Sequence, residues 1–169
     1  MRLDPAQASD FRLALGHFAS GLVVLTAPGP VGLTVQSLMS LSLDPPLVAL
    51  GIDRRSRAWP AVTGPFCLNV LHAEQYELAR RFGVTGPDKF AGGHWRAAED
   101  GVPELTEAHA WLRCGVHAQY DGGDHHLVVA EVRGLRLGSG EPLLYHRGHA
   151  GTFEKRNGRQ GKSWTPAST

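Results

Sequence analysis

Hydrophobic and polar side chains alternate along residues 33–43 of this sequence. The apolar side chains are Leu33, Val35, Met39, Leu41 and Leu43, and the polar ones are Thr34, Gln36, Ser40 and Ser42. A period of two is typical of strands that have one apolar and one polar face. Ser37 and Leu38 break the alternation as a swapped pair, which indicates a bulge or loop that turns Ser37 toward the other polar groups.

A helix is the alternative interpretation of this segment, because Thr34, Ser37 and Ser40 also follow one another at intervals of three. Serine and β-branched residues are poor helix formers, however, and Gly32 precedes them. We therefore expect a strand, a loop and a second strand before the Asp44-Pro45-Pro46 segment breaks the pattern.

The rest of the pattern predicts more strands and a few short helices. Strands are expected at 22–27, from residue 31, and at 47–52, 66–71, 112–120, 125–137 and 142–146. Helices are expected at 11–18 with Asp10 as N-cap, at 57–62 with Ser56 as cap, and at 73–82, whereas residues 83–105 are typical of a long loop. Because a βαβ series would need a helix between nearly all strands, the prediction is a mainly β fold with peripheral helices, a closed or partly closed antiparallel barrel.

Composition adds limits to this picture. The chain has 169 residues, of which 42% are hydrophobic, enough for one domain with an apolar core. We expect that domain to span residues 1–153, followed by a polar and basic tail at 154–169. Lysine and arginine together number 17 and aspartate and glutamate 16, so no global field favours nucleic acid or an anionic membrane.

Two further features indicate a cytoplasmic protein. The N-terminal residues lack the apolar core of a signal peptide, and no apolar run approaches the length of a membrane span. Cys67 and Cys114 both lie in apolar segments, which is typical of reduced, buried thiols, and no C-x-x-C motif is present.

The polar face of residues 33–43 carries no charged side chain. An ordinary solvent-facing strand is one explanation, but solvated faces usually include charged residues. Neutral hydroxyl and amide groups can bind a neutral ligand without the cost of desolvating a charge. The pattern therefore makes this face a candidate binding site for a neutral ring rich in hydrogen-bonding groups.

Several segments resemble the short-chain flavin reductases, the NAD(P)H-dependent reductase components of two-component flavin-dependent monooxygenases. The segments that carry the resemblance are FRLALGHFASGLVVLTA, GLTVQSLMSLSLDPPLVALGID with RRS, FCLNVL, GGDHHLVVAEV and EPLLYHRG. They cover roughly residues 10–153 and occur in the family's order. The resemblance implies a homodimeric FMN-binding split β-barrel that transfers hydride from NADH or NADPH to FMN or FAD and supplies reduced flavin to a partner monooxygenase.

The resemblance also implies which residues form the site. The segment that wraps the flavin ring and ribityl chain in that family corresponds to Thr34, Val35, Gln36, Ser37, Ser40 and Ser42. The turn that holds the phosphate corresponds to Asp53, Arg54 and Ser56, where a capped helix start would add an anion site, and a further cofactor-proximal segment to Arg81 and Phe82. The family's G-D-H motif corresponds to Gly123, Asp124 and His125, so His125 is expected to position the nicotinamide.

This chain departs from the family pattern at Gln36, Ala130 and His149, where asparagine, glycine and tyrosine are frequent. Without the resemblance, His125 would be an ordinary surface or core histidine, and strand alternation sends it and His126 to opposite faces. No metal is expected, because no ligand spacing supports a site among the nine histidines.

Two other functions stay open from the sequence. The same barrel could bind flavin without turnover, as a carrier or sensor, or it could hold haem or another cofactor. Oxidation of a reduced nicotinamide nucleotide in the presence of flavin would distinguish a reductase from a flavin carrier or sensor. The absorption spectrum of the purified protein would distinguish it from a protein that holds haem or another cofactor.

Overall fold

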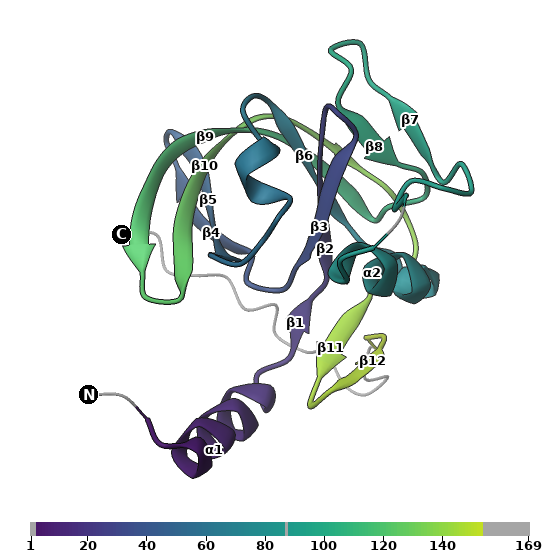
Figure 1. Ribbon diagram of the computed structural model, residues 1–169. Coiled ribbons are helices and arrows are strands. Elements are labelled where there is room, and N and C mark those ends of the chain that lie inside the picture. Colours follow the sequence, from purple (N-terminus) through teal and green to yellow (C-terminus); the bar gives the residue numbers. More distant parts are fainter. Residues whose placement is uncertain (1–2, 87, 154–169) are drawn as a thin grey trace.

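Seven antiparallel strands form the central sheet of the protein, whose computed structural model describes residues 3–86 and 88–153 (Figure 1). The strands are β2 (Val23–Ala27), β3 (Val31–Val35), β4 (Met39–Leu43), β5 (Pro46–Asp53), β6 (Phe66–Val70), β9 (Ala110–Gly122) and β10 (His125–Leu137). Their order in the sheet is β3-β2-β6-β9-β10-β5-β4. Each neighbouring pair is antiparallel.

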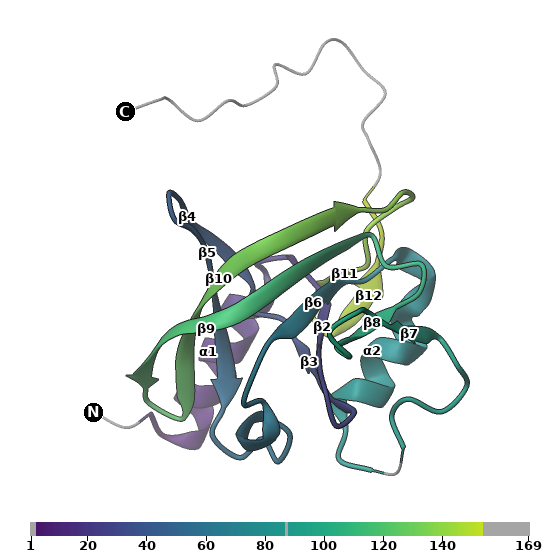
Figure 2. The ribbon, with the colours of Figure 1, turned by 90° about the horizontal axis from the view of Figure 1, so that it is seen from above.

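The connection between β3 and β4 forces this sheet to roll up. These two strands stand at opposite edges of the sheet, yet only residues 36–38 join them. In a flat sheet of seven strands the edges would lie roughly 29 Å apart, since neighbouring strands are about 4.8 Å apart. Four Cα steps span at most about 14 Å. The sheet therefore curves into a barrel (Figure 2). Its two edge strands are joined by this short connection and do not pair with each other, so the predicted split barrel is confirmed.

The barrel has apolar side chains on both of its surfaces. β2 is buried along its whole length, because alternate residues face different cores. Leu25 packs inside the barrel with Leu50 and Phe66, whereas Val24 faces outward toward Phe82 of α2 (Tyr76–Gly83). Burial on both faces fixes the position of α2 against β2 and β3, and so fixes one wall of the site described below.

Shorter elements surround the barrel. They are α1 (Pro5–Gly16), β1 (Ser20–Gly21), the 3-10 turns η1 (Trp59–Ala61) and η2 (Ala73–Gln75), β7 (Trp95–Ala97), β8 (Pro103–Leu105), β11 (Leu144–His146) and β12 (His149–Gly151). β1, β11 and β12 form a small sheet, and β7 pairs with β8. In Figure 1, α1 stands apart from the barrel at the end of an extended segment.

Most predicted strands are confirmed, and the bounds of β10 agree with the prediction at both ends. The predicted start of the first helix was wrong: it begins at Pro5, not Phe11. Asp4 is the true N-cap, because its carboxylate accepts a hydrogen bond from the Gln7 N–H at 2.9 Å and the Gln7 side chain accepts one from the Asp4 N–H at 3.0 Å. This capping box, with Pro5 at the first position, outcompetes the isolated Asp10.

Two further predictions needed correction. The stretch expected as a helix at 57–62 contains only the three-residue turn η1, in keeping with Pro60, and Ala58 is its N-cap residue. The expected loop at 83–105 contains the hairpin of β7 and β8. The tail predicted at 154–169 lies outside the described residues.

Cys67 and Cys114 are both free and buried, as the sequence indicates. Burial raises the pKa of each thiol to about 12, so both stay protonated at neutral pH. Among the residues described here, no helix is long and apolar enough to cross a membrane.

Candidate functional site

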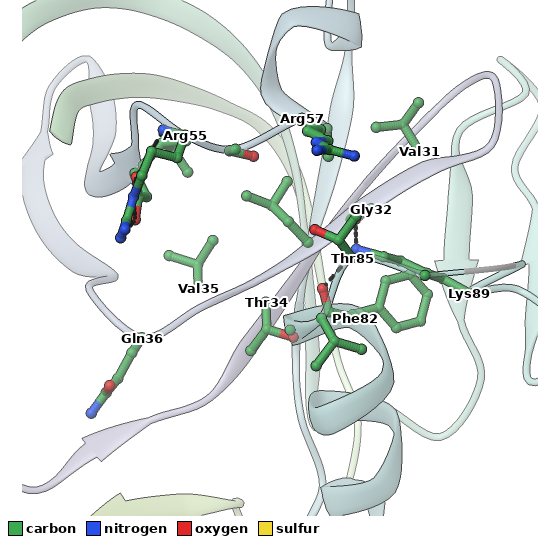
Figure 3. A pocket seen from close by; sticks show the side chains of 18 of the residues that line it. Val31, Gly32, Thr34, Val35, Gln36, Arg55, Arg57, Phe82, Thr85 and Lys89 are labelled. Atoms are coloured by element: carbon green, nitrogen blue, oxygen red, sulfur yellow. Dashed lines mark hydrogen bonds and ion pairs between the residues drawn. The ribbon is translucent and has the colours of Figure 1, made fainter. Parts of the chain in front are cut away.

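An open cavity of about 1060 Å³ lies where β3, the turn after β5 and the segment after α2 meet (Figure 3). Eight of the residues predicted for the site line it, from four separate parts of the chain. They are Thr34, Val35, Gln36, Ser37, Asp53, Ser56, Phe82 and His125. The other four, Ser40, Ser42, Arg54 and Arg81, do not line this cavity.

Ser37 holds the barrel together at one end of the cavity. Its hydroxyl accepts a hydrogen bond from the Gly51 N–H at 2.8 Å and donates to the Gly51 carbonyl at 3.1 Å. The side chain thus replaces a strand pairing between the β3–β4 connection and β5. His125 lies beside this bridge, because a Cβ built on Gly51 would be 3.7 Å from its ring and 3.3 Å from the Ser37 hydroxyl.

Thr34 and Gln36 differ in how much of their hydrogen-bonding capacity is in use. The Thr34 hydroxyl donates to the Ala79 carbonyl of α2 at 2.6 Å, so it is an acceptor toward the cavity. Gln36 is exposed, and its amide has no hydrogen-bond partner among the described residues. Figure 3 shows Gln36 on the side of the cavity away from Lys89. Of the neutral groups predicted from the sequence, the Gln36 amide and the acceptor side of the Thr34 hydroxyl are therefore available to a ligand.

Positive charge collects on other parts of the wall, and not all of it is neutralised. Arg55 makes a two-pronged ion pair with Asp53, at distances of 2.7 and 3.1 Å, and this pairing lowers the pKa of the Asp53 carboxyl far below its usual value. Arg57 forms no ion pair within the described chain. Lys89 donates to the carbonyls of Gly32 and Phe82 at 3.1 and 3.0 Å (Figure 3).

Lys89 has no carboxylate partner among the described residues, and burial lowers the pKa of its ammonium group. A partly desolvated cation without a counter-ion gains stability when an anion arrives. Arg57 and Lys89 were not predicted as site residues. The arginines that follow β5 in the sequence could have indicated Arg57. Lys89 lies in a segment that the sequence analysis interpreted as a loop, where no sequence pattern indicates a binding residue.

The helix start expected at Ser56, which would have added to an anion site, is not present in the structure. Only the single turn η1 follows, and its first N–H, that of Trp59, already donates to the Ser56 hydroxyl at 3.3 Å. Without a helix of several turns there is no row of free N–H groups and no substantial dipole. The contribution of a helix terminus to anion binding is therefore missing at this turn.

The four predicted residues outside the cavity have other surroundings. Arg54 contacts the turn between β9 and β10, and Arg81 donates to the Ala91 carbonyl at 2.6 Å. Ser40 and Ser42 lie on β4, at the other edge of the sheet, where Ser40 is exposed and Ser42 half-buried.

His125 is held by its neighbour in sequence. Its Nδ1 lies 2.7 Å from a carboxylate oxygen of Asp124, and this contact lowers the pKa of the Asp124 carboxyl. His126 instead contacts the Gln119 amide, at 3.2 Å, as the strand alternation predicts. Among residues 3–86 and 88–153, no three potential metal ligands lie together.

The rolled antiparallel sheet with a cavity at its seam defines a split barrel, and the wall of this cavity carries both neutral polar side chains and cations. Comparison with known proteins identifies the class. Residues 15–154 match the flavin reductase like domain, and the chain belongs to this family.

Individual relatives agree with that assignment. The chain is 42% identical to the reductase subunit HsaB of a flavin-dependent monooxygenase from Mycobacterium tuberculosis, over 82% of this chain and 78% of that protein. A homologue of nitrilotriacetate monooxygenase component B from Mycobacterium thermoresistibile superposes with a TM-score of 0.87 at 37% identity, covering 95% and 94% of the two chains. The NADH:FAD oxidoreductase SgcE6 of Streptomyces globisporus, in complex with NAD and FAD fragments, gives 0.85 at 31% identity, covering 94% and 99%.

Gly32 shapes the cavity wall, because a Cβ at this position would clash with the Phe82 ring and lie 3.1 Å from the Leu25 carbonyl. We expect Gly32→Ala to lower the free energy of unfolding by about 1–3 kcal/mol, the usual cost of overpacking. Urea denaturation measures this. Gly83→Ala is the control, since its Cβ would meet Thr34 at an ordinary 3.8 Å. An equal loss in both variants, or the same loss in a Phe82→Leu background, would contradict the clash.

Proposed function

We propose that this cavity binds FMN or FAD together with NADH or NADPH, and that the protein is the flavin reductase that supplies reduced flavin to a partner monooxygenase. The observation that carries the proposal is the polarity of the cavity wall: it combines neutral hydrogen-bonding groups and a histidine with two cations that have no carboxylate partner among the described residues. A flavin mononucleotide has the same division between a neutral ring and a phosphate.

A flavin bound here would supply the redox chemistry by accepting hydride from a reduced nicotinamide ring. The protein's own residues bind and align the two molecules. Val35 offers an apolar surface, and Gln36 offers an amide that can donate and accept. The Ser37 hydroxyl is already used in its bridge to Gly51, so its part in the site is to keep the cavity edge in place.

Arg57 and Lys89 are the residues that we assign to the phosphate. Both line the cavity, from the turn after β5 and the segment after α2 (Figure 3). Asp53 neutralises Arg55, so Arg55 is less available for an anion. The third hydrogen of the Lys89 ammonium group is free for a phosphate oxygen once Gly32 and Phe82 have accepted the other two.

His125 is the residue that we assign to the nicotinamide. It lines the cavity beside Ser37 and Gly51. The Asp124 carboxylate accepts from Nδ1–H in the proposed tautomer and leaves Nε2 to meet the ligand. For Ser40, Ser42 and Arg81, flavin binding stays a prediction from the sequence.

Reductase turnover is the direct test of this function. Purified protein mixed with FMN or FAD and either NADH or NADPH should consume the nucleotide under air, as followed by the loss of absorbance of the reduced nicotinamide. Flavin binding without consumption would favour the carrier or sensor instead. A haem spectrum in the purified protein would contradict both.

Lys89→Met tests the phosphate assignment. Loss of one charge-assisted hydrogen bond should weaken FMN binding by roughly tenfold or more and leave riboflavin, which lacks the phosphate, within about twofold. Fluorescence titration measures both affinities, and thermal melting checks the fold. Arg80→Met is the matched control, because Arg80 is exposed on α2 and paired with Glu77. Equal losses for FMN and riboflavin would show that Lys89 does not contact the phosphate.

We also propose that the protein is a homodimer. α1 has no buried residue, and Phe11 and Leu15 on one side of it are 56% and 58% exposed. Isolated helices of about 12 residues are only marginally stable in water, so this helix needs a surface to pack on. No described segment of the same chain covers it, and a second copy supplies a matching apolar surface.

Light scattering after gel filtration tests the homodimer. The wild type should elute at twice the mass of the chain, and Phe11→Glu with Leu15→Glu should shift it toward the monomer. Arg12→Ala, on the same helix, should leave the dimer unchanged. A monomeric wild type would refute the proposal.

A cytoplasmic location is consistent with this function. Reduced nicotinamide nucleotides are available in that compartment, and the two cysteines are free.

A further inference from the structure

Arg54 belongs to the turn that the family resemblance assigns to the phosphate, but its side chain does not line the cavity. Arg55 and Arg57, its neighbours, line the cavity, whereas Arg54 does not. Its hydrogen bonds and its ion pair go to the tip of the β9–β10 hairpin: to Asp121 near the end of β9, and to the turn residues Gly123 and Asp124, which immediately precede His125. An assignment of Arg54 to the flavin phosphate therefore conflicts with the direction of its side chain.

Three contacts connect Arg54 to this turn. Its Nε donates to the Gly123 carbonyl at 2.7 Å, its Nη2 lies 2.8 Å from a carboxylate oxygen of Asp121, and its backbone N–H donates to the Asp124 carbonyl at 3.0 Å. The same Asp121 oxygen accepts from the Gly123 N–H at 2.9 Å. The Gly123 N–H bond and the Arg54 pair together lower the pKa of the Asp121 carboxyl.

These contacts lie at the tip of the β9–β10 hairpin, beyond the end of the ladder between β5 and β10. The ladder between β5 and β10 ends at the pair Asp53 and His125, and residues 119–124 are exposed. Gly123 has a φ of +80°, so the turn itself is a glycine-dependent conformation. Within the described part of the chain, no core packing fixes the tip of this hairpin, and the Arg54 side chain joins it to the end of β5.

The ion pair is too exposed to matter much for global stability. The side chains of Arg54 and Asp121 are 39% and 80% exposed, and exposed pairs contribute little to folding. The planar guanidinium, which contacts two groups at fixed angles, instead restricts the geometry of the turn.

We propose that Arg54 is a positioning residue for hydride transfer: it clamps the β9–β10 turn so that Asp124 and His125 face the nicotinamide nucleotide. This inference rests on the proposed function, in which His125 meets the nicotinamide. Arg54 touches neither ligand, and its effect reaches the reaction only through the turn.

Steady-state kinetics and flavin titration of Arg54→Ala test the clamp. We expect the KM for the nicotinamide nucleotide to rise roughly tenfold, as small displacements of positioning groups commonly cause, while flavin affinity stays within about twofold. Asp121→Ala should act in the same direction, and the double variant should add little, because both changes break one unit. Arg54→Lys, which keeps the charge but not the planar fork, should recover only part of the effect.

The control is Arg133→Ala, which removes another exposed arginine pair, with Glu131, from β10 far from the turn. It should leave both constants unchanged. Weaker flavin binding in Arg54→Ala with an unchanged KM would overturn the clamp and return Arg54 to the phosphate site. If both the KM for the nicotinamide nucleotide and the flavin affinity of Arg54→Ala equal those of the wild type, the clamp is overturned as well.

Amide hydrogen exchange separates a failure of the clamp from a failure of the proposed function. Residues 121–125 should exchange faster in Arg54→Ala than in the wild type and in Arg133→Ala, whatever ligand the cavity binds. If the wild type turns over no nicotinamide, the proposed function fails, and exchange still shows whether Arg54 holds the turn. Unchanged exchange overturns the clamp in every case.

Discussion

The three-residue connection between β3 and β4 is the constraint on which the rest of the structure depends. It joins the two edges of a seven-stranded sheet, so the sheet must curve until those edges approach each other. A strand ladder does not complete the closure, and the Ser37 hydroxyl bonds to both backbone groups of Gly51 at the seam. The opening of the barrel lies beside this bridge, and the cavity follows from it.

Charge in the cavity follows from the same geometry. The turn after β5 and the segment after α2 bring Arg57 and Lys89 to one cavity although they are 32 residues apart in the sequence. Asp53 neutralises Arg55 on the same wall. The site that we propose for the flavin therefore offers few unpaired charges, which favours a moderate affinity. A reductase that hands its product to a partner needs a ligand it can release, and binding near the micromolar range, ~8 kcal/mol, is of that order.

The sequence predicted the fold well where local signals were unambiguous. The two-residue turn Gly123-Asp124 marks the start of β10, and the swapped pair Ser37 and Leu38 marks the break between β3 and β4. It failed where two signals competed or none existed. Asp4 and Asp10 both precede helical residues, and only the partner Gln7 decides between them. The β7–β8 hairpin is short, and its polar surroundings are typical of a loop.

The site was harder to predict because position in a turn decides which way a side chain points. Three chemically alike arginines lie close together in the sequence but have different surroundings. Arg54 contacts the hairpin tip, Arg55 pairs with the Asp53 carboxylate, and Arg57 lines the cavity. A family pattern assigns the turn as a whole to the phosphate, and only the backbone path separates its members. Because β5 pairs with β10 up to Asp53, the next residue must lie against the β9–β10 turn, and the two that line the cavity come later. The same register that brings His125 to the cavity therefore directs Arg54 away from it, which makes the division of roles a consequence of the ladder and not of the arginines themselves.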